Sequence, residues 1–461
     1  MPIQPYRIAV LLLSVCFLLS ASGPLNAAQP QKRPPNIIFV LVDDMGYADI
    51  GCMGCKDIRT PHIDRLAKEG VRFTNFYANA PVCTPTRAAF ITGRYQQRAG
   101  LEWALGFTAE QYRRVGDKWV PEPDKLALGL PAGERTIADL LKEAGYGTAA
   151  YGKWHLGFQP EHNPTKRGFD EYFGNLLGHA DFYRYVYFDG TYQLYENDKP
   201  AKAKGYLTDL YNQRATDFIN RMGQKPFFLY VPHLAVHFPF QPPGRPDPPV
   251  TMENKFDGTR RDYAAMLECI DDGIGMMLAA LEKQGTLDNT LFIFSSDNGG
   301  ERLSDNTPLF NQKTTLWEGG IRVPCLMRWP AQLPQGKVID QPAITMDLTA
   351  TILAAAGVSL PKDRPLDGID LLPILTGKQP PVERTFCWRV DRPGRKQKAI
   401  RHGDWKFIQD DMVELLFHLQ EDIGERHNLG YQHPAIKDKL KKMLADWEAD
   451  VDRQPPAFVV K

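Results

Sequence analysis

The sequence Asn36-Ile37-Ile38-Phe39-Val40-Leu41-Val42-Asp43-Asp44 is a continuous apolar run that ends in two carboxylates. An apolar run without polar interruptions predicts a strand that is covered on both faces. Three further runs have the same form, and each leads into polar residues that could do chemistry: Gly147–Tyr151, Pro226–Val231 and Leu291–Phe294. We therefore expect four buried strands.

Helical patterns lie between these runs. Segments that begin at Thr60, Thr136 and Arg260 carry apolar residues at helical spacing. Strands that alternate with helices predict an α/β fold, with a large, mostly parallel but mixed sheet sandwiched between helices. In such sheets the binding crevice lies at the carboxyl ends of the strands. The polar residues after the four runs should therefore converge on one edge.

The length and charge of the chain limit its class. A chain of 461 residues is too long for one small core, so we expect a large domain with a smaller companion. Lys and Arg together number 55, as do Asp and Glu, so the charge balance does not indicate nucleic acid or a membrane surface as a partner. Any attraction for an anionic substrate must be local.

The N-terminus resembles a secretory signal. Arg7 precedes the apolar stretch Ile8–Leu19, and Ala27-Ala28 offer a cleavage site, so we interpret residues 1–28 as a signal peptide. No later segment has the roughly 20 apolar residues of a membrane span. We expect an exported protein, periplasmic or secreted. Lipid anchoring at Cys16 is the alternative, although Val15 before it makes a poor site.

A proline-rich turn at Pro373–Pro381 predicts a boundary between a catalytic domain, residues 29–380, and a C-terminal domain, residues 381–461. In the second domain we expect short antiparallel strands and one helix, an α+β arrangement, at these positions: Thr385–Val390, Lys398–Arg401, Trp405–Ile408 and the helix Ala435–Trp447.

Cysteines are sparse for an exported chain, so a dense disulfide framework is excluded. Cys52 and Cys55 have the spacing of zinc ligands, but no second pair accompanies them. A local disulfide and two packed thiols both remain open.

The stretch Pro81-Val82-Cys83-Thr84-Pro85-Thr86-Arg87 predicts the start of a helix. Thr84 could cap it, and Pro85 suits the first helical position. A side chain at such a position faces unpaired N–H groups that favour an anion, so Cys83 is a candidate nucleophile for an anionic substrate. The alternative is a structural cysteine buried beside a capped helix.

Polar groups after the strands suit a metal and an anion. Asp43, Asp44, Asp297 and Asn298 offer the hard oxygen ligands that Ca²⁺ takes, and two such pairs at strand ends favour a metal over solvated turns. Lys153 and His155 are two residues apart, so on an extended strand they point to the same side.

Cys83, Pro85 and Arg87 reproduce the C-x-P-x-R signature of the sulfatase family, and the chain resembles that family from about Asn36 to its C-terminus. Further blocks of the family follow in the same order: Gly152-Lys153-Trp154-His155-Leu156-Gly157, Val236-His237-Phe238-Pro239, Asn311-Gln312-Lys313-Thr314-Thr315 and Glu318-Gly319-Gly320-Ile321-Arg322-Val323-Pro324.

The resemblance implies an exported sulfuric ester hydrolase. Cys83 would be oxidised to formylglycine by a formylglycine-generating enzyme, and the aldehyde hydrate would attack sulfur. Calcium would be bound by Asp43, Asp44, Asp297 and Asn298, with the oxygen at position 83 or the substrate completing the shell.

The remaining residues receive roles from the same resemblance. Lys153, Lys313 and His237 would bind the sulfate, and Arg87 would stabilise the hydrate. His237 or a lysine would protonate the leaving alcohol, and His155 would then take a proton from the second hydroxyl so that sulfate is expelled. His233 competes with His237 for its role.

The substrate is expected to be a sulfated polysaccharide or its oligosaccharides. The stretch His162–Asn197 is rich in aromatic residues, and such clusters more often pack a core than bind sugars. Tyr183 and Tyr185, beside Arg184, could nevertheless stack on sugars. Gly100–Leu128 is interpreted as an insertion near the mouth of the site. One alternative function is a phosphatase or phosphodiesterase of the same superfamily, which Asn298 disfavours and Thr84 keeps open. The other is a silent glycan-binding protein with an unmodified Cys83.

Overall fold

The apolar run at Asn36 is strand β1 (Asn36–Val42), which lies in the interior of a ten-stranded sheet. The computed structural model describes residues 1–2, 33–106, 112–115, 118–121, 129–360, 364–392 and 395–453. β1 pairs in parallel with β10 (Phe227–Pro232) on one side and with β11 (Thr290–Ser296) on the other. β6 (Gly147–Tyr151) pairs in parallel with β10. All four predicted strands are therefore confirmed.

The sheet is mixed, as expected. Its order is β13-β2-β12-β11-β1-β10-β6-β7-β8-β9, and antiparallel pairs occur toward both edges. The outer strands are β2 (Val71–Phe73), β7 (Glu171–Asn175), β8 (Leu194–Glu196), β9 (Lys199–Pro200), β12 (Cys325–Arg328) and β13 (Lys337–Ile339). Smaller pairs are β3 (Phe76–Tyr77) with β14 (Ala343–Ile344) and β4 (Tyr112–Val115) with β5 (Lys118–Pro121).

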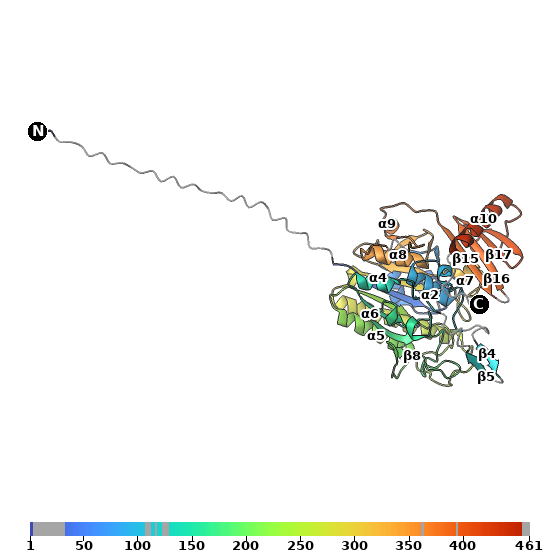
Figure 1. The fold of residues 1–461 in the computed structure, drawn as a ribbon, viewed down its shortest axis with the longest axis horizontal. Helices are drawn as coiled ribbons and strands as arrows, with labels where there is room; N and C mark the ends of the chain where they lie inside the picture. The colour runs from blue at the N-terminus through green and yellow to red at the C-terminus, as the bar shows by residue number, and fades with distance from the viewer. Residues whose placement is uncertain are drawn as a thin grey trace. The chain divides into compact units, whose positions relative to one another are not determined.

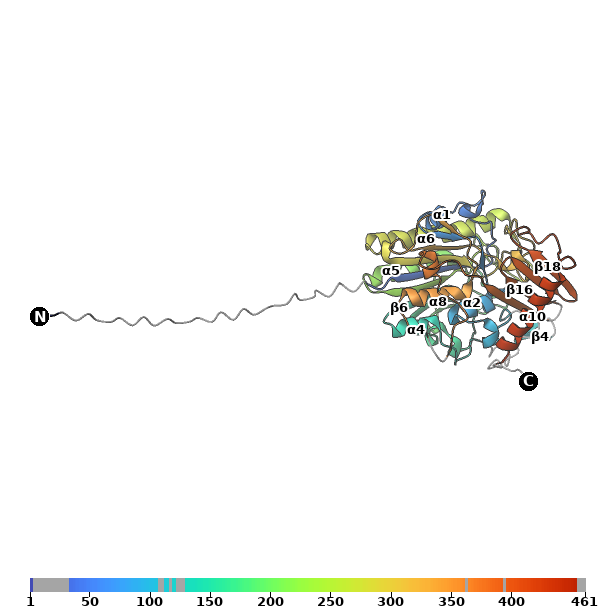
Figure 2. The same ribbon diagram turned by 90° about the horizontal axis from the view of Figure 1, so that it is seen from above.

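Side chains of β1 alternate between two cores because successive residues of a strand point to opposite faces. Ile38, Val40 and Val42 pack with α1 (Pro61–Lys68), α5 (Leu207–Met222) and α6 (Arg260–Lys283). On the other face, Ile37, Phe39 and Leu41 pack with α2 (Cys83–Thr92), α4 (Ile137–Glu143) and α8 (Thr345–Ala355). Figure 2 shows the two helix layers on opposite sides of the sheet.

Two of the predicted helices begin at capping boxes. The hydroxyls of Thr136 and Thr259 each accept a hydrogen bond from the backbone three residues on, and Asp139 and Asp262 accept one in return. These reciprocal bonds satisfy backbone N–H groups that have no partner inside the helix. Two further helices are short: α7 (Glu318–Ile321) and α9 (Leu372–Leu375).

The C-terminal region forms a separate antiparallel sheet, which confirms the α+β prediction (Figure 1). Its strands are β15 (Thr385–Arg392), β16 (Arg395–His402), β17 (Trp405–Asp410) and β18 (Val413–His418), and α10 (Pro434–Val451) covers one face. The other face packs on residues of the large domain, including Tyr77, Ile321 and Ile344. The boundary at residue 380 stays a prediction.

The remaining predictions concern other parts of the chain. The predicted signal peptide, apart from residues 1 and 2, and most of Gly100–Leu128, including the side chains of β4 and β5, lie outside the described residues. Among the helices that the structure describes, none combines the length and apolar composition of a membrane crossing. Cys52 and Cys55 are partly exposed free thiols, so the disulfide alternative is wrong.

Candidate active site

Cys83 is the first residue of α2 and lies at the carboxyl edge of the sheet, with only 3% of its surface exposed. Its sulfur is 3.1 Å from Nδ1 of His155. Burial raises the pKa of the Cys83 thiol, although Lys153 opposes that effect. A free thiol here would therefore stay protonated and react poorly as a nucleophile.

The prediction that Thr84 caps the helix is wrong. Val82 occupies the cap position, and no side chain caps the helix there. The Thr84 hydroxyl instead donates to the carbonyl of His155 and accepts from the backbone N–H of Leu105. Thr84 therefore fixes the backbone on which His155 stands.

Arg87 lies one turn after Cys83 and is fully buried. Its Nε and Nη2 donate to Oδ2 of Asp297 at 3.0 and 2.8 Å, and its Nη1 donates to the carbonyl of Lys153 at 2.7 Å. A guanidinium presents donors in a fixed fork, so one side chain can join α2, β11 and the loop after β6.

The four predicted metal ligands come together as expected for strand ends. Ligand atoms of Asp43, Cys83 and Asp297 all lie within 4.8 Å of one another. The amide of Asn298 donates to Oδ1 of Asp44 at 2.7 Å. These residues follow β1 and β11, which are adjacent and parallel, so both acidic pairs meet at one edge.

The donor set fits a hard divalent cation. Burial and the nearby charge of Asp297 raise the pKa of Asp43 well above its usual range. Oδ1 of Asp43 and Oδ1 of Asn298 are buried without a hydrogen-bond partner among the described residues. Buried oxygens of this kind are costly unless something coordinates them, and oxygen atoms are what calcium takes.

Two lysines reach the same carboxylates. Lys153 donates to Oδ2 of Asp43, and Lys313 donates to Oδ2 of Asp44 at 2.6 Å. Lys313 also lies 3.8 Å from Glu301, a residue that the sequence interpretation missed. Arg87, Lys153 and Lys313 balance the charges of the three aspartates that they contact. A bound divalent cation would therefore make the site positive, which suits an anionic substrate.

His155 directs a basic nitrogen at residue 83. Its Nε2 lies 2.6 Å from the carbonyl oxygen of Leu105, which can only accept, so Nε2 carries the proton. Nδ1, which faces Cys83, is then unprotonated in the neutral ring. Burial and Lys153 lower the pKa of His155 well below its usual range, so the neutral form prevails.

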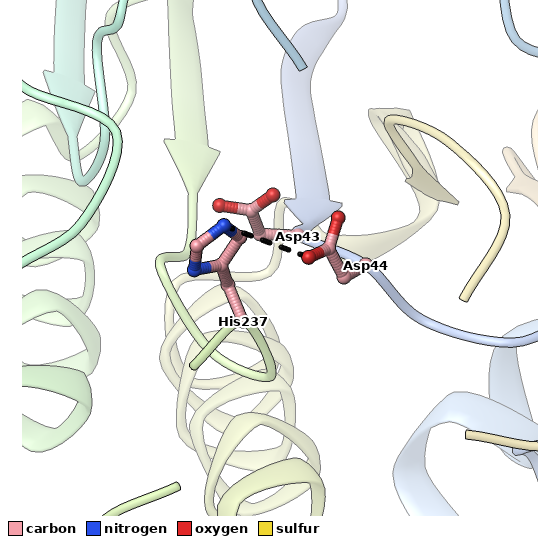
Figure 3. A group of neighbouring side chains, drawn as sticks. All are labelled: Asp43, Asp44 and His237. Carbon is pink, nitrogen blue, oxygen red and sulfur yellow. Dashed lines mark ion pairs between the residues drawn. The ribbon is translucent and has the colours of Figure 1, made fainter. Parts of the chain in front are cut away.

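His237 occupies the position predicted for the second histidine. Its Nδ1 donates to the carbonyl of Phe238 at 2.6 Å, and its Nε2 lies 3.6 Å from Oδ2 of Asp44. Figure 3 shows the ring facing the two aspartates, which follow strand β1. His233, the competitor, is fully buried, and neither of its ring nitrogens has a hydrogen-bond partner among the described residues.

Strained backbone also gathers here. Asp44, His155 and Thr314 have φ values of 62°, 56° and 72°. Left-handed conformations are uncommon for residues other than glycine and cluster at functional sites. Thr314 follows Lys313, so three separate segments each have a strained residue at or beside a candidate site residue.

The aromatic stretch contributes differently from the prediction. Tyr185 is 3% exposed and donates to the carbonyl of Gly205, so its expected exposure is wrong. Tyr183 donates to the carbonyl of Pro242. His179, which sequence reasoning missed, packs against Tyr187 and Phe188, and its ring lies 6.3 Å from the ring of His237. No sequence pattern around His179 distinguishes it from the other core residues of this stretch.

Comparisons with known proteins agree with the geometry. A family model described as Sulfatase matches residues 35–358, and one described as N-sulphoglucosamine sulphohydrolase, C-terminal, matches residues 308–450. N-acetylgalactosamine-6-sulfatase of Mus musculus is 34% identical over 480 residues, which cover 92% of this chain and 87% of the relative.

Solved structures agree as well. The crystal structure of Ps i-CgsB has a TM-score of 0.82 at 34% identity, over 92% of this chain and 95% of that one. Its complex with k-i-k-neocarrahexaose has the same TM-score at 33% identity, over 93% of this chain and 95% of that one. Because the first family model spans every strand end and loop that carries a candidate site residue, this chain belongs to the sulfatase family of sulfuric ester hydrolases.

Proposed function

We propose that this sulfatase is exported and hydrolyses sulfate esters on a glycan, with residue 83 as formylglycine and with calcium at the neighbouring carboxylates. The observation that carries the proposal is the position of Cys83. Its sulfur lies within 4.8 Å of oxygens of Asp43 and Asp297 and 3.1 Å from the unprotonated nitrogen of His155. The proposed nucleophile, its proton acceptor and the proposed cation site are therefore neighbours in the interior of the protein.

Two groups complete the proposed chemistry. When present, formylglycine hydrate supplies the attacking hydroxyl, and calcium offsets the charge of the sulfate and polarises one of its oxygens. Asp43, Asp44, Asp297 and Asn298 would hold the cation. A formylglycine-generating enzyme is the partner that this proposal requires during maturation.

The chain's own residues bind the sulfate and move protons. Lys153 and Lys313 bind sulfate oxygens as ammonium groups, and Arg87 holds Asp297 and the helix that carries residue 83 in place. Nδ1 of His155 accepts a proton from the side chain at position 83. One of the lysines donates a proton to the departing alcohol, or His237 does so through Nε2 when its ring carries a second proton besides the one that Nδ1 donates to Phe238.

We propose a glycan as the substrate because a sulfate ester on a sugar is an anion that the two lysines could bind, and because the names of two similar proteins mention sugars. N-acetylgalactosamine-6-sulfatase is named for a sulfated sugar, and Ps i-CgsB was solved with an oligosaccharide. The wild-type rates on nitrophenyl sulfate, nitrophenyl phosphate and a panel of sulfated glycan fragments test the proposal. Faster turnover of the phosphate than of every sulfate ester would favour the phosphatase alternative.

Replacing the nucleophile should separate activity from folding. We expect Cys83→Ala to lower hydrolysis of the preferred glycan fragment by at least about 1,000-fold, since the attacking group is gone. The circular dichroism spectrum and melting temperature should stay close to wild type. Cys269→Ala, on helix α6, is the matched control and should keep full activity. Wild-type activity in a preparation whose residue 83 has the mass of an unmodified cysteine would refute the formylglycine assignment.

Removing the metal should be reversible. We expect a chelator to abolish most activity and to lower the melting temperature, because a ligand that binds only the folded state stabilises it. Added calcium should restore both. Recovery with zinc but not with calcium would show that the oxygen-rich site has been assigned to the wrong metal.

A further inference from the structure

A row of aromatic rings leads from the site to the surface. The ring of His237 lies 4.0 Å from that of Phe238, and Phe238 lies 4.7 Å from Phe256 and 6.5 Å from Phe188. Exposure increases along the row, from 8% at Phe238 to 37% at Phe256. A large aromatic side chain that is exposed beside a buried site offers a face to a ligand.

Two cations lie on these same rings. The ammonium of Lys255 is 5.2 Å from the centre of the Phe188 ring and 4.9 Å from that of Phe256. The guanidinium of Arg302 is 5.4 Å from the Phe256 ring. At such distances the ring faces attract the cations and help to orient them. We call Phe188, Lys255, Phe256 and Arg302 the cation–aromatic strip.

The strip adjoins the groups that would bind sulfate. Glu301, the neighbour of Arg302 in the chain, lies 3.8 Å from Nζ of Lys313. Its carboxyl also interacts electrostatically with Lys255 and Arg302. At its inner end the strip meets Phe238, beside His237. Glu301 thus lies between the two cations of the strip and Lys313, one of the proposed sulfate ligands.

A neutral sugar could bind to the aromatic rings alone and would not need the two cations. Sugar faces stack on aromatic rings, whereas Lys and Arg are the side chains that bind carboxylate and sulfate groups through charge-assisted hydrogen bonds. In the strip the cations lie 4.9 to 5.4 Å from the centres of the rings. It therefore matches a ligand that carries a sugar ring and an anion together.

We propose that the cation–aromatic strip is a subsite for a second anionic group, on the sugar next to the sulfate ester that is cleaved. The substrate is then a polyanionic glycan, whose neighbouring sugar bears a carboxylate or a second sulfate. This inference rests on the proposed function and adds to it the charge of the part of the substrate outside the sulfate pocket.

The test uses wild type and the double variant Lys255→Met with Arg302→Met, in calcium-loaded protein whose residue 83 is converted. The probes share the sulfated monosaccharide that wild type cleaves best in a panel. They are that monosaccharide itself and three disaccharides in which the neighbouring sugar is neutral, carries a carboxylate, or carries a sulfate ester. Lys283→Met, at the far end of α6, is the control variant.

We expect wild type to prefer an anionic disaccharide over the neutral one by about tenfold in kcat/KM, which is the effect of one good charge-assisted contact. The double variant should lose this preference and keep its rate on the monosaccharide and on the neutral disaccharide. Lys283→Met should behave as wild type. The better of the two anionic probes identifies the anion as carboxylate or sulfate.

Two results would overturn the subsite: equal kcat/KM for neutral and anionic disaccharides in wild type, or an unchanged preference in the double variant. A uniform loss on all four probes in the double variant would also overturn it, because the strip would then only support the fold of the site. If converted wild type cleaves no sulfate ester at all, the proposed function itself fails.

Discussion

At the scale of single residues, the two histidines of the site are fixed by backbone carbonyls. Leu105 accepts from Nε2 of His155, and Phe238 accepts from Nδ1 of His237. Each ring therefore directs its other nitrogen at the cluster, and the two rings do so with opposite nitrogens. A substitution that frees either ring would change which nitrogen faces the substrate without changing the residue's charge.

His233 has an effect on stability and not on chemistry. Burial lowers its pKa to about 3, so the folded protein resists the proton that the unfolded chain binds near its ordinary pKa of about 6.5. The folded pKa is the lower one, so the stability from His233 is full above pH 6.5 and is lost as pH falls below it. Between pH 7 and pH 5 the loss is about 2 kcal/mol.

We therefore expect His233→Leu to reduce the acid sensitivity of folding. The free energy of unfolding, measured by urea denaturation at pH 7 and at pH 5, should fall by about 2 kcal/mol less in the variant than in wild type. Activity at pH 7 should remain. An identical drop in both proteins would mean that His233 is not the group that titrates.

The sequence predicts the chemistry of site residues better than their surroundings. Asp43 and Asp297 could be found because each follows a continuous apolar strand. The choice between His233 and His237 depends on the path of one loop, which no periodicity describes. Tyr185 has charged neighbours in sequence, yet it packs in the core because its segment folds back on the sheet.

At the scale of elements, strand β16 holds the loop that carries Lys313. Nη1 of Arg395 donates to the carbonyl and the hydroxyl of Thr314, and Gln397 accepts from the backbone N–H of Leu316. The backbone N–H of Thr314 donates to the carbonyl of Pro81, just before helix α2. The C-terminal sheet thus positions a residue of the large domain's site.

Arg395→Ala should therefore weaken catalysis from a distance. We expect kcat/KM on the preferred sulfate ester to fall about tenfold, mostly through KM, because a misplaced cation binds the sulfate less well. Lys396→Ala, the exposed neighbour on the same strand, is the control and should match wild type. An Arg395→Ala enzyme with unchanged KM and kcat would show that the loop holds its own shape.

Helices and strands differed in how well their sequence patterns predicted them. The central strands and α6 were predictable because long apolar runs and a long helical period are strong signals. Helix α8 was missed because Thr345–Leu353 are buried on all sides, which leaves no polar face to define a period. Outer strands such as β2 and β13 have three residues each, too few to show alternation.

At the scale of the whole molecule, a buried ion network joins the C-terminal sheet to helix α7. Lys406 of β17 is fully buried, and its Nζ lies 2.7 Å from Glu318 and 2.9 Å from Glu425. Arg322 pairs with the same Glu318 at 3.1 Å. Trp388 of β15 adds a hydrogen bond to the carbonyl of Ala78. The C-terminal region is therefore part of the folding unit that supports the site.

Lys406→Met should destabilise the whole protein. The variant leaves Glu318 paired with Arg322 but removes the cation that faces the buried carboxyl of Glu425. Removing one partner of a buried ion pair costs about 3 to 5 kcal/mol. Urea denaturation should show this loss in the free energy of unfolding. Lys442→Met, which breaks an exposed pair with Asp446, should change it by less than about 1 kcal/mol. Equal stability of the two variants would mean that the network is not a support.

Under the proposed chemistry, the burial of Cys83 determines whether its conversion comes before or after folding. An enzyme that converts this side chain must grip the surrounding peptide, and in the finished fold every residue of α2 is shielded. If residue 83 is converted as proposed, conversion therefore has to precede folding of the chain. Molecules that fold before conversion would keep the thiol. The yield of active enzyme from an expression host would therefore depend on the rate of conversion relative to the rate of folding.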